Sequence, residues 1–178
     1  MPKVEVLVGL PGSGKSTFLA FVDDPEFGDT VFVYSTDAGI ESAAKALGMS
    51  YNDAFDGFIG PATKEMNARL DVALRMGVDV YWDQTNMSSK KRKGILSKFP
   101  KTYRKECWCI RPPQTDEEWG DLELRLLFRQ AETGKFIPIH IINAMADSYV
   151  EPELDEGFDK ITIVDLYGNI IAEKGTSK

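Results

Sequence analysis

The residues best suited to chemistry lie near the N-terminus, where Gly9-Leu10-Pro11-Gly12-Ser13-Gly14-Lys15-Ser16 satisfies the pattern G-x-x-x-x-G-K-[ST]. The glycines let the backbone curl so that its N–H groups point at anionic oxygens, and a helix that begins near Lys15 adds its positive end. Lys15 would contact the β- and γ-phosphates of a nucleotide, and the Ser16 hydroxyl would bind Mg²⁺. The pattern therefore predicts a phosphate-binding loop (P-loop) formed by Gly9, Pro11, Gly12, Ser13, Gly14, Lys15, Ser16 and Thr17.

Two aspartates that follow strand-like segments could complete such a site. Asp83 comes directly after the hydrophobic residues 78–82, where a strand-end carboxylate would help to bind Mg²⁺; alternatively, Asp83 caps the next helix. Asp37 stands just past residues 31–35. Because ligands of an open parallel sheet lie off the carboxyl ends of its strands, Asp37 would face the γ-phosphate and could accept the proton of an attacking hydroxyl. Alternatively, Asp37 is the N-cap of the following helix.

A group of cations in the second half of the chain could cover the phosphates. Arg125 and Arg129 are four residues apart, hence on one face of a helix, and Lys135 follows in a turn. Such cations could clamp the phosphates and exclude water as an α-helical lid. Alternatively, the two arginines form a solvated stripe beside Glu123 and Glu132. The spacing does not decide which of Arg125 and Arg129 is the main lid arginine.

The framework around these residues alternates between two kinds of element. Strands are predicted at residues 4–9, 31–35, 78–82, 103–110, 161–165 and 169–172, and helices at residues 15–22, 41–47, 61–76, 89–99 and 115–132 and after Pro138. Asp24-Pro25 and Gly28-Asp29 mark the loop after the first helix, and Thr115 with Glu118 forms a capping box. This order predicts an α/β fold with a parallel sheet of about five strands and helices on both faces, in one domain over residues 1–178.

Composition narrows the class of protein. Of 178 residues, 43% are hydrophobic and 28% charged, which is typical of a soluble globular domain. No stretch approaches the roughly 20 apolar residues of a membrane span, and no secretory signal precedes the first strand, so we expect a cytoplasmic protein. Cys107 and Cys109 lie two residues apart on a predicted strand, which suits small hydrophobic side chains better than a disulfide or a zinc site.

Charge bears on the partners. The net charge of −7 argues against strong sequence-independent binding to DNA or RNA, which depends on Lys and Arg at phosphates. A dense basic run at residues 90–93 could still form a local basic groove, or a solvated helix face. No N-K-x-D pattern for guanine is present, so the expected nucleotide is ATP, bound with Mg²⁺.

Four segments of the chain resemble the kinase domain of phage polynucleotide 5′-hydroxyl kinase and its stand-alone P-loop relatives. They are the loop at residues 9–17; Ser35-Thr36-Asp37; Asp83-Gln84-Thr85-Asn86 followed by Lys91-Arg92; and the stretch from Arg129 through Gly134-Lys135-Phe136-Ile137-Pro138 to Met145 and Tyr149. The resemblance covers most of the chain. It implies a P-loop kinase fold that transfers the γ-phosphate of ATP to the 5′-hydroxyl of a nucleic acid.

The resemblance also implies roles for single residues. Asp37 matches the general base, Lys15 and Ser16 match the phosphate-binding lysine and the metal-ligand serine, and Asp83 matches the strand-end aspartate. Arg129 is the best match for the lid arginine, although the lid spacing differs and Arg125 competes for that role.

Two departures from the family leave other acceptors open. Ile40 stands where the phage enzyme has an arginine that contacts the acceptor phosphate, and no D-x-D pattern for a phosphatase domain is present. The acceptor could therefore be a modified DNA base, a nucleoside or a small metabolite, for which Tyr51, Asn52, Phe55 and Phe58 are candidate pocket residues. A third alternative is a P-loop ATPase that acts as a switch or binding protein, with Gln84 to position water.

Overall fold

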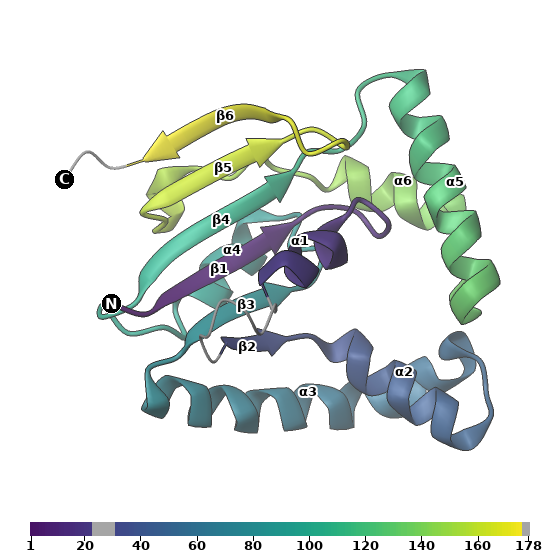
Figure 1. Ribbon diagram of the computed structural model, residues 1–178, viewed down its shortest axis with the longest axis horizontal. Coiled ribbons are helices and arrows are strands. Elements are labelled where there is room, and N and C mark those ends of the chain that lie inside the picture. The colour runs from purple at the N-terminus through teal and green to yellow at the C-terminus, as the bar shows by residue number, and fades with distance from the viewer. Residues whose placement is uncertain (23–30, 176–178) are drawn as a thin grey trace.

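The computed structural model describes residues 1–22 and 31–175, and the loop predicted at Asp24-Pro25 and Gly28-Asp29 lies outside them. In this part of the chain, six strands form one sheet in the order β2-β3-β1-β4-β5-β6 (Figure 1). Strands β1 to β5 pair in parallel, and β6 is antiparallel to β5. The predicted α/β class is therefore confirmed: five strands are parallel, and the strand predicted at residues 169–172 returns beside β5 as an antiparallel hairpin.

The sheet is assembled from β-branched and aromatic residues. Its strands are β1 (Lys3–Val8), β2 (Val31–Tyr34), β3 (Asp79–Asp83), β4 (Arg104–Ile110), β5 (Lys160–Val164) and β6 (Ile170–Gly175). The central strand β1 is buried from Val4 to Val8, as expected for a parallel strand that is covered on both faces. The register places Leu7 beside both Asp83 and Trp108, so that β1, β3 and β4 end at one edge.

Helices cover both faces of the sheet and its carboxyl edge (Figure 1). They are α1 (Lys15–Val22), α2 (Thr36–Leu47), α3 (Tyr51–Met76), α4 (Ser89–Leu96), α5 (Asp116–Thr133) and α6 (Ile139–Asp147), with a 3-10 turn, η2, at Leu154–Glu156. On one face, Leu19 of α1 packs with Leu7 and Tyr81. The larger core on the opposite face receives residues of α3 and α4. Helices α5 and α6 stand beyond the carboxyl ends of the strands.

Two helices begin earlier than predicted. Helix α2 starts at Thr36, with Ser35 as N-cap, so Asp37 lies in its first turn, where an acidic residue is favourable. Helix α3 starts at Tyr51 and continues through Pro61, so the predicted start at residue 61 is wrong. The Ser50 side chain caps α3 by accepting from the Asp53 N–H at 3.2 Å. Packing of α3 against α2 then outweighs the cost of the internal proline.

Glycines end three of the helices, and the predicted capping box at Thr115 is corrected. Gly48, Gly77 and Gly134 end α2, α3 and α5 at φ values of 65°, 66° and 69°. The Thr115 side chain accepts from the Glu118 N–H, but the Glu118 carboxylate accepts from Gln114 instead of closing the capping box. In α6, Ile141 is 39% exposed, whereas its neighbour Ile142 is fully buried.

The remaining predictions concern thiols and membranes. Cys107 and Cys109 are buried free thiols on β4, in agreement with the prediction. Among the residues that the structure describes, no helix combines the length and the apolar character that crossing a bilayer requires.

Candidate active site

The loop between β1 and α1 depends on glycine at two positions. A Cβ atom at Gly9 would lie 2.6 Å from Ser13 Oγ, and one at Gly12 would lie 3.1 Å from Leu126 of α5. Both glycines also have positive φ values, 156° and 77°. A larger residue at Gly9 would therefore push against Ser13, and one at Gly12 would push against Leu126 of α5. The tight turn of the loop, which directs its N–H groups inward, requires glycine at both positions.

Lys15 and Ser13 give this loop the properties of an anion cradle. The Lys15 ammonium donates to the carbonyls of Gly9 and Leu10, both at 2.9 Å, and so folds back across the loop. Burial lowers the pKa of Lys15 to about 8. The buried Ser13 hydroxyl has no hydrogen-bond partner among the described residues. An unpaired buried donor beside a buried cation fits the oxygens of a polyphosphate.

A cavity of about 1190 Å³ opens at the carboxyl edge of the sheet. It is lined by every predicted site residue except Gly9: Pro11, Gly12, Ser13, Gly14, Lys15, Ser16, Thr17, Asp37, Asp83, Arg125, Arg129 and Lys135. Typical pockets for one small ligand measure about 300–1,000 Å³. The cavity is therefore large enough for a nucleotide and a second molecule.

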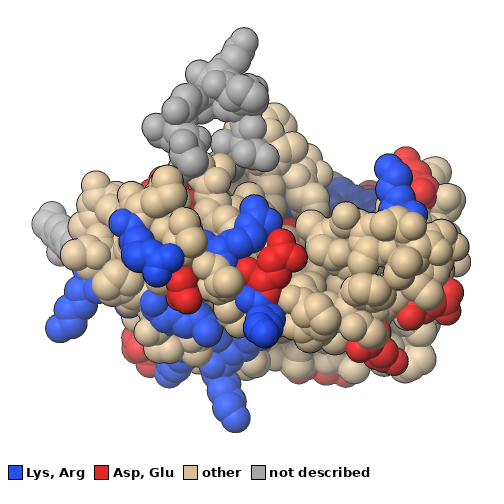
Figure 2. Space-filling view, turned by 90° about the horizontal axis from the view of Figure 1, so that it is seen from below, with Lys and Arg blue, Asp and Glu red and all other residues tan. Residues whose placement is uncertain are grey.

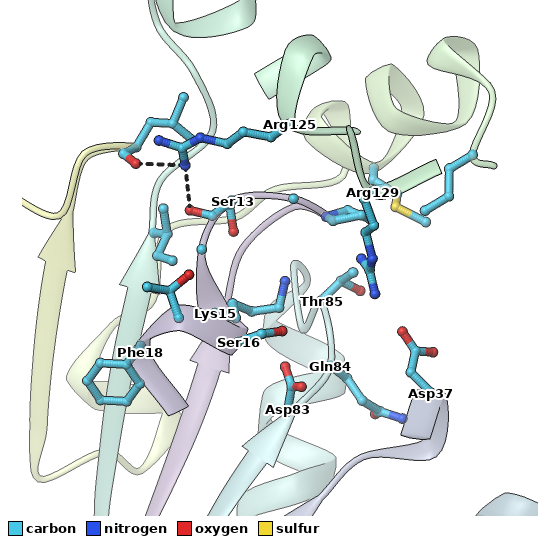
Figure 3. Close-up of a pocket in the computed structure, with 18 of the residues that line it drawn as sticks. Ser13, Lys15, Ser16, Phe18, Asp37, Asp83, Gln84, Thr85, Arg125 and Arg129 are labelled. Atoms are coloured by element: carbon cyan, nitrogen blue, oxygen red, sulfur yellow. Dashed lines mark hydrogen bonds between the residues drawn. The ribbon is translucent and has the colours of Figure 1, made fainter. Parts of the chain in front are cut away.

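The charged groups converge on Lys15. Those that act on its pKa, besides burial, are Asp83, Arg129, Asp37 and Lys135. Figure 3 shows Arg129 and Asp37 on the opposite side of the cavity from Ser16 and Asp83. The predicted residues thus lie within electrostatic reach of one another, although they come from four separate segments of the chain.

Ser16 and Asp83 lie on the same side of the cradle (Figure 3). Burial raises the pKa of Asp83, against the effect of Lys15. The described residues contain no group of three or more His, Cys, Asp or Glu side chains that could hold a metal by themselves. This donor set fits Mg²⁺, which is commonly bound through one carboxylate, a hydroxyl and the phosphates of its nucleotide.

Asp37 is held from two sides. The Tyr51 hydroxyl donates to Asp37 Oδ1 at 2.8 Å, and the Lys135 ammonium donates to Oδ2. Burial raises the pKa of Asp37, but Lys135 and Tyr51 outweigh it, and the pKa lies below its ordinary value. Asp37 is therefore an ionised carboxylate that faces the cavity, and Ser35 takes the N-cap position that was its alternative role.

The two candidate lid arginines point to different parts of the cavity (Figure 3). Arg129 pairs with Glu41 at 3.5 Å and acts on the pKa values of both Lys15 and Asp37. Arg125 donates to the Ser13 carbonyl at 3.4 Å and to the Leu166 carbonyl at 3.1 Å, and thus joins the P-loop to the segment after β5. The structure therefore separates two residues that the sequence left as competitors.

The segment after α5 is tied to α2 and α3 across the cavity. The Asn52 side chain donates to the Phe136 carbonyl at 2.9 Å and accepts from the Phe136 N–H at 3.3 Å. The buried Lys135 also approaches Glu41 at 3.9 Å. These contacts hold Lys135 and Arg129 close to the first turn of α2, which carries Asp37.

Two groups of lining residues were not fully predicted. Phe18, Trp108, Leu166, Tyr167 and Gly168 line the end of the cavity near Arg125, and the rings of Phe18 and Trp108 stack at 4.6 Å. The segment 166–168 follows the carboxyl end of β5, so the strand-end rule applied to Asp37 could have found it.

The other end of the cavity, beside Asp37, has an apolar wall. Tyr51, which is bonded to Asp37, lines it with Phe55, whose ring lies 5.9 Å from that of Tyr51, and with Ile59, which packs on the same buried cluster as Tyr51. Of the four residues that the sequence suggested for an acceptor pocket, Tyr51 and Phe55 do line the cavity. The other two are corrected: Asn52 holds Phe136, and Phe58 packs against the buried cluster of α2 and α3.

The basic run at residues 90–93 is not one surface. Arg92 is fully buried and pairs with Glu156 at 2.6 Å, and it donates to the carbonyls of Asn86 and Met87. Lys91 lines the cavity instead. On the face seen in Figure 2, Lys and Arg side chains gather mainly over one half of the surface, with a few Asp and Glu side chains among them.

The loop between β3 and α4 is locked against the P-loop. The Gly9 N–H donates to the Thr85 carbonyl at 3.0 Å. Asn86, with a φ of 50°, is fully buried and donates to the Leu7 carbonyl at 2.7 Å. Asp83 and Thr85 are thereby fixed relative to Lys15.

Comparison with known proteins agrees with this geometry. The model of the AAA domain family matches residues 4–152. A chain of the PezAT chromosomal toxin–antitoxin system of Streptococcus pneumoniae superposes with a TM-score of 0.63 at 18% identity, over 97% of this chain and 72% of that one. A candidate kinase from Chloroflexus aurantiacus gives 0.62 at 17% identity, over 92% and 85%. A gluconokinase from Sinorhizobium meliloti gives 0.50 at 18% identity, over 93% and 83%.

At these identities the likeness shows the fold alone. It is a P-loop kinase-like fold, as predicted, and the matches do not favour phage polynucleotide kinase over other P-loop kinases.

Proposed function

This chain belongs to the AAA domain family, and from that premise we propose that it is an ATP-dependent phosphotransferase that acts on a hydroxyl acceptor. The observation that carries the proposal is that the ionised Asp37 shares one cavity with the P-loop lysine, Lys15, with Arg129 and Lys135 over both. A carboxylate at that place can accept the proton of a hydroxyl acceptor as its oxygen attacks the γ-phosphate.

The P-loop side would hold the nucleotide. Its N–H groups and Lys15 bind the β- and γ-phosphates, and Ser16 and Asp83 hold Mg²⁺. Mg²⁺, when bound, neutralises charge on the phosphate oxygens. Arg125, which already joins the P-loop to Leu166, holds the nucleotide end of the cavity in shape.

The transfer step would take place between Lys15 and Asp37. The acceptor oxygen forms a bond to the γ-phosphorus, the bond from that phosphorus to the β–γ bridging oxygen breaks, and ADP leaves. The acceptor proton passes to Asp37, while Arg129 offsets the charge on the transferred group. Because such transition states are loose, the carboxylate chiefly orients the hydroxyl and needs little base strength.

Lys135 would connect the two halves of the reaction. In the structure the Lys135 ammonium group donates a hydrogen bond to the Asp37 carboxylate and lowers the pKa of that carboxyl. If Lys135 turns to the γ-phosphate when ATP binds, Asp37 loses its strongest cation and becomes a better proton acceptor. The acceptor would then replace Lys135 as the hydrogen-bond partner of Asp37.

The acceptor that we propose first is the 5′-hydroxyl of a nucleic acid, on the resemblance of the four sequence segments. The second candidate is a modified DNA base, a nucleoside or a small metabolite. The apolar wall with Tyr51 and Phe55 favours this second candidate. A switch ATPase is less well supported, because Gln84 is already bonded to Thr36 and Trp82.

An acceptor panel tests the proposal. Purified protein, Mg²⁺ and γ-labelled ATP are incubated with 5′-hydroxyl DNA and RNA oligonucleotides, single-stranded and recessed, and with nucleosides and sugars. We expect label on an acceptor hydroxyl, and on an oligonucleotide 5′ end if the first candidate is correct. Label released only as inorganic phosphate with every acceptor would overturn the phosphotransferase proposal in favour of the ATPase.

A further inference from the structure

Gln84 directly follows Asp83 at the end of β3 and lines the cavity, and its side-chain amide is held in one orientation. The indole N–H of Trp82 donates to the Gln84 amide oxygen at 3.2 Å. An indole N–H can only donate, so the amide oxygen must face Trp82 and the NH₂ group must lie on the other side. Trp82 is 3% exposed, and its ring stacks on that of Tyr34 at 3.7 Å. A turned amide would leave this buried indole without an acceptor, so the orientation is fixed.

This orientation directs the NH₂ group of Gln84 toward the start of α2 (Figure 3). One of its two N–H bonds donates to the hydroxyl of the buried Thr36 at 3.2 Å. Asp37, the next residue, accepts from Tyr51 and Lys135, and it makes no hydrogen bond with Gln84. In the part of the chain that the structure describes, the second N–H of Gln84 therefore has no protein acceptor.

The unused N–H suits a phosphate oxygen better than an attacking water molecule. Gln84 lines the same cavity as the P-loop, and it lies between Asp83 and Asp37 in Figure 3. The oxygens of an ionised phosphate only accept hydrogen bonds, and the free group of Gln84 only donates. A glutamine that orients an attacking water needs its amide oxygen to accept a proton from that water, and here the indole of Trp82 occupies this oxygen.

We propose that the second N–H of Gln84 donates to an oxygen of the γ-phosphate, and that Trp82 is a positioning residue that keeps this donor directed into the cavity. A cation at this place would pair with Asp83 or Asp37. A neutral amide leaves both carboxylates available, one for Mg²⁺ and one for the acceptor hydroxyl. This inference rests on the proposed function for the place of the γ-phosphate, between the P-loop and Asp37.

Equilibrium binding tests the contact without requiring turnover. Each protein is titrated with Mg·ADP and with the Mg²⁺ complex of β,γ-imido-ATP, which carries the additional γ-phosphate. Gln84→Met keeps the length of the side chain and removes its amide. It should bind the ATP analogue roughly tenfold more weakly, which is the size of one hydrogen bond to a charged group, and should bind Mg·ADP as wild-type protein does. Unchanged affinity for the analogue, or an equal loss for both nucleotides, would overturn the contact.

Two further variants separate this contact from a general effect on folding. Gln84→Glu keeps an acceptor for the indole of Trp82 but has no donor, so it should lose at least as much affinity for the ATP analogue as Gln84→Met. Gln130→Met is the matched control, because Gln130 is exposed on α5 and lies outside the cavity. It should bind both nucleotides as wild-type protein does. A Gln84→Glu variant with wild-type affinity for the analogue would show that Gln84 only supports its neighbours.

Trp82→Phe tests the positioning role. It keeps an aromatic ring against Tyr34 and removes the indole donor, so the Gln84 amide can turn. It should lose part of the affinity for the ATP analogue and none for Mg·ADP. In a Gln84→Met background, Trp82→Phe should cause no further loss, because it acts only through Gln84. Additive losses, or a loss for both nucleotides, would overturn the positioning role.

A transfer assay with γ-labelled ATP and the acceptor panel distinguishes this inference from the proposed function. If Gln84→Met loses affinity for the ATP analogue but wild-type protein labels no acceptor, the contact with the γ-phosphate stands and the phosphotransferase is refuted. If wild-type protein labels an acceptor and Gln84→Met binds the analogue with full affinity, the phosphotransferase stands and the contact is refuted.

Discussion

Tyr51 donates its hydroxyl hydrogen to one carboxylate oxygen of Asp37 at 2.8 Å, while Lys135 contacts the other oxygen of the same group. The Lys135 ammonium also lies 3.9 Å from the centre of the Tyr51 ring. Asp37, Tyr51 and Lys135 come from α2, α3 and the segment after α5, respectively. The orientation and the basicity of Asp37 therefore depend on contacts between three separate parts of the chain.

Replacing Tyr51 by Phe separates the effect of the hydrogen bond to Asp37 from the effect of the aromatic ring beside Lys135. Tyr51→Phe keeps the aromatic face for Lys135 and removes the donor to Asp37 Oδ1. If this bond orients Asp37 for the acceptor, kcat should fall about tenfold, which is the value of one charge-assisted hydrogen bond. The affinity for Mg·ATP should stay unchanged, since Tyr51 does not contact the P-loop. Steady-state kinetics with the acceptor varied measures both, and an unchanged kcat would contradict the orienting role.

The low pKa of Lys15 predicts an alkaline limit to nucleotide binding. Burial lowers that pKa to about 8 in the free protein. Lys15 is therefore charged below pH 8 and increasingly neutral above it, and the affinity for Mg·ADP should decline from about pH 8 to pH 9.5. Titrations at half-unit intervals measure this decline. Lys135→Met should move the decline to higher pH, because the Lys135 ammonium is one of the cations that lower the pKa of Lys15; a wild-type affinity that stays constant up to pH 9.5 would refute the assignment to Lys15.

Arg125 and Arg129 should give different kinetic defects. Arg129 lies among the charged groups, so Arg129→Ala should lower kcat roughly 100-fold or more with a smaller change in nucleotide affinity. Arg125 bridges the P-loop and Leu166, so Arg125→Ala should mainly raise the KM for ATP. The measurement is a comparison of kcat and KM for ATP in both variants. If Arg125→Ala instead lowered kcat and Arg129→Ala instead raised the KM for ATP, the roles assigned to the two arginines would be wrong.

The buried pair of Arg92 and Glu156 should support stability through its charge balance. Glu156→Ala leaves Arg92 buried without its anion, which should lower the free energy of unfolding by about 3–5 kcal/mol. Glu151→Ala, at an exposed partner of Lys174, is the control and should cost less than about 1 kcal/mol. Urea denaturation measures both values. A Glu156→Ala variant as stable as the control would show that water replaces the carboxylate.

Much of the site could be predicted from the sequence, because the backbone geometry of short segments determines where several of its residues lie. The glycine spacing of the P-loop and the strand-end positions of Asp37 and Asp83 rest on short-range backbone geometry. The rule that ligands lie off the carboxyl ends of parallel strands then brought these segments to one edge. The same rule applied to β5 would have added the segment 166–168.

Other features depend on contacts far apart in the chain. Lys91 and Arg92 are neighbours in one basic run, yet Lys91 lines the cavity and Arg92 is buried, because Glu156 lies 64 residues further on. Likewise, α3 continues through Pro61 because it packs on α2, which no propensity within residues 51–61 reveals. Arg125 and Arg129 share a helix face in sequence, and only the position of α5 over the P-loop separates them.

Asp37→Asn tests the central claim, that the carboxylate of Asp37 receives the acceptor proton opposite the P-loop. Transfer of labelled γ-phosphate to the best acceptor of the panel is measured beside Mg·ATP binding, for wild-type protein and for this variant. We predict that the variant binds Mg·ATP normally and transfers phosphate at least 100-fold more slowly, within the range of about 10²–10⁴ that acid–base groups contribute. Full transfer by Asp37→Asn would contradict the account.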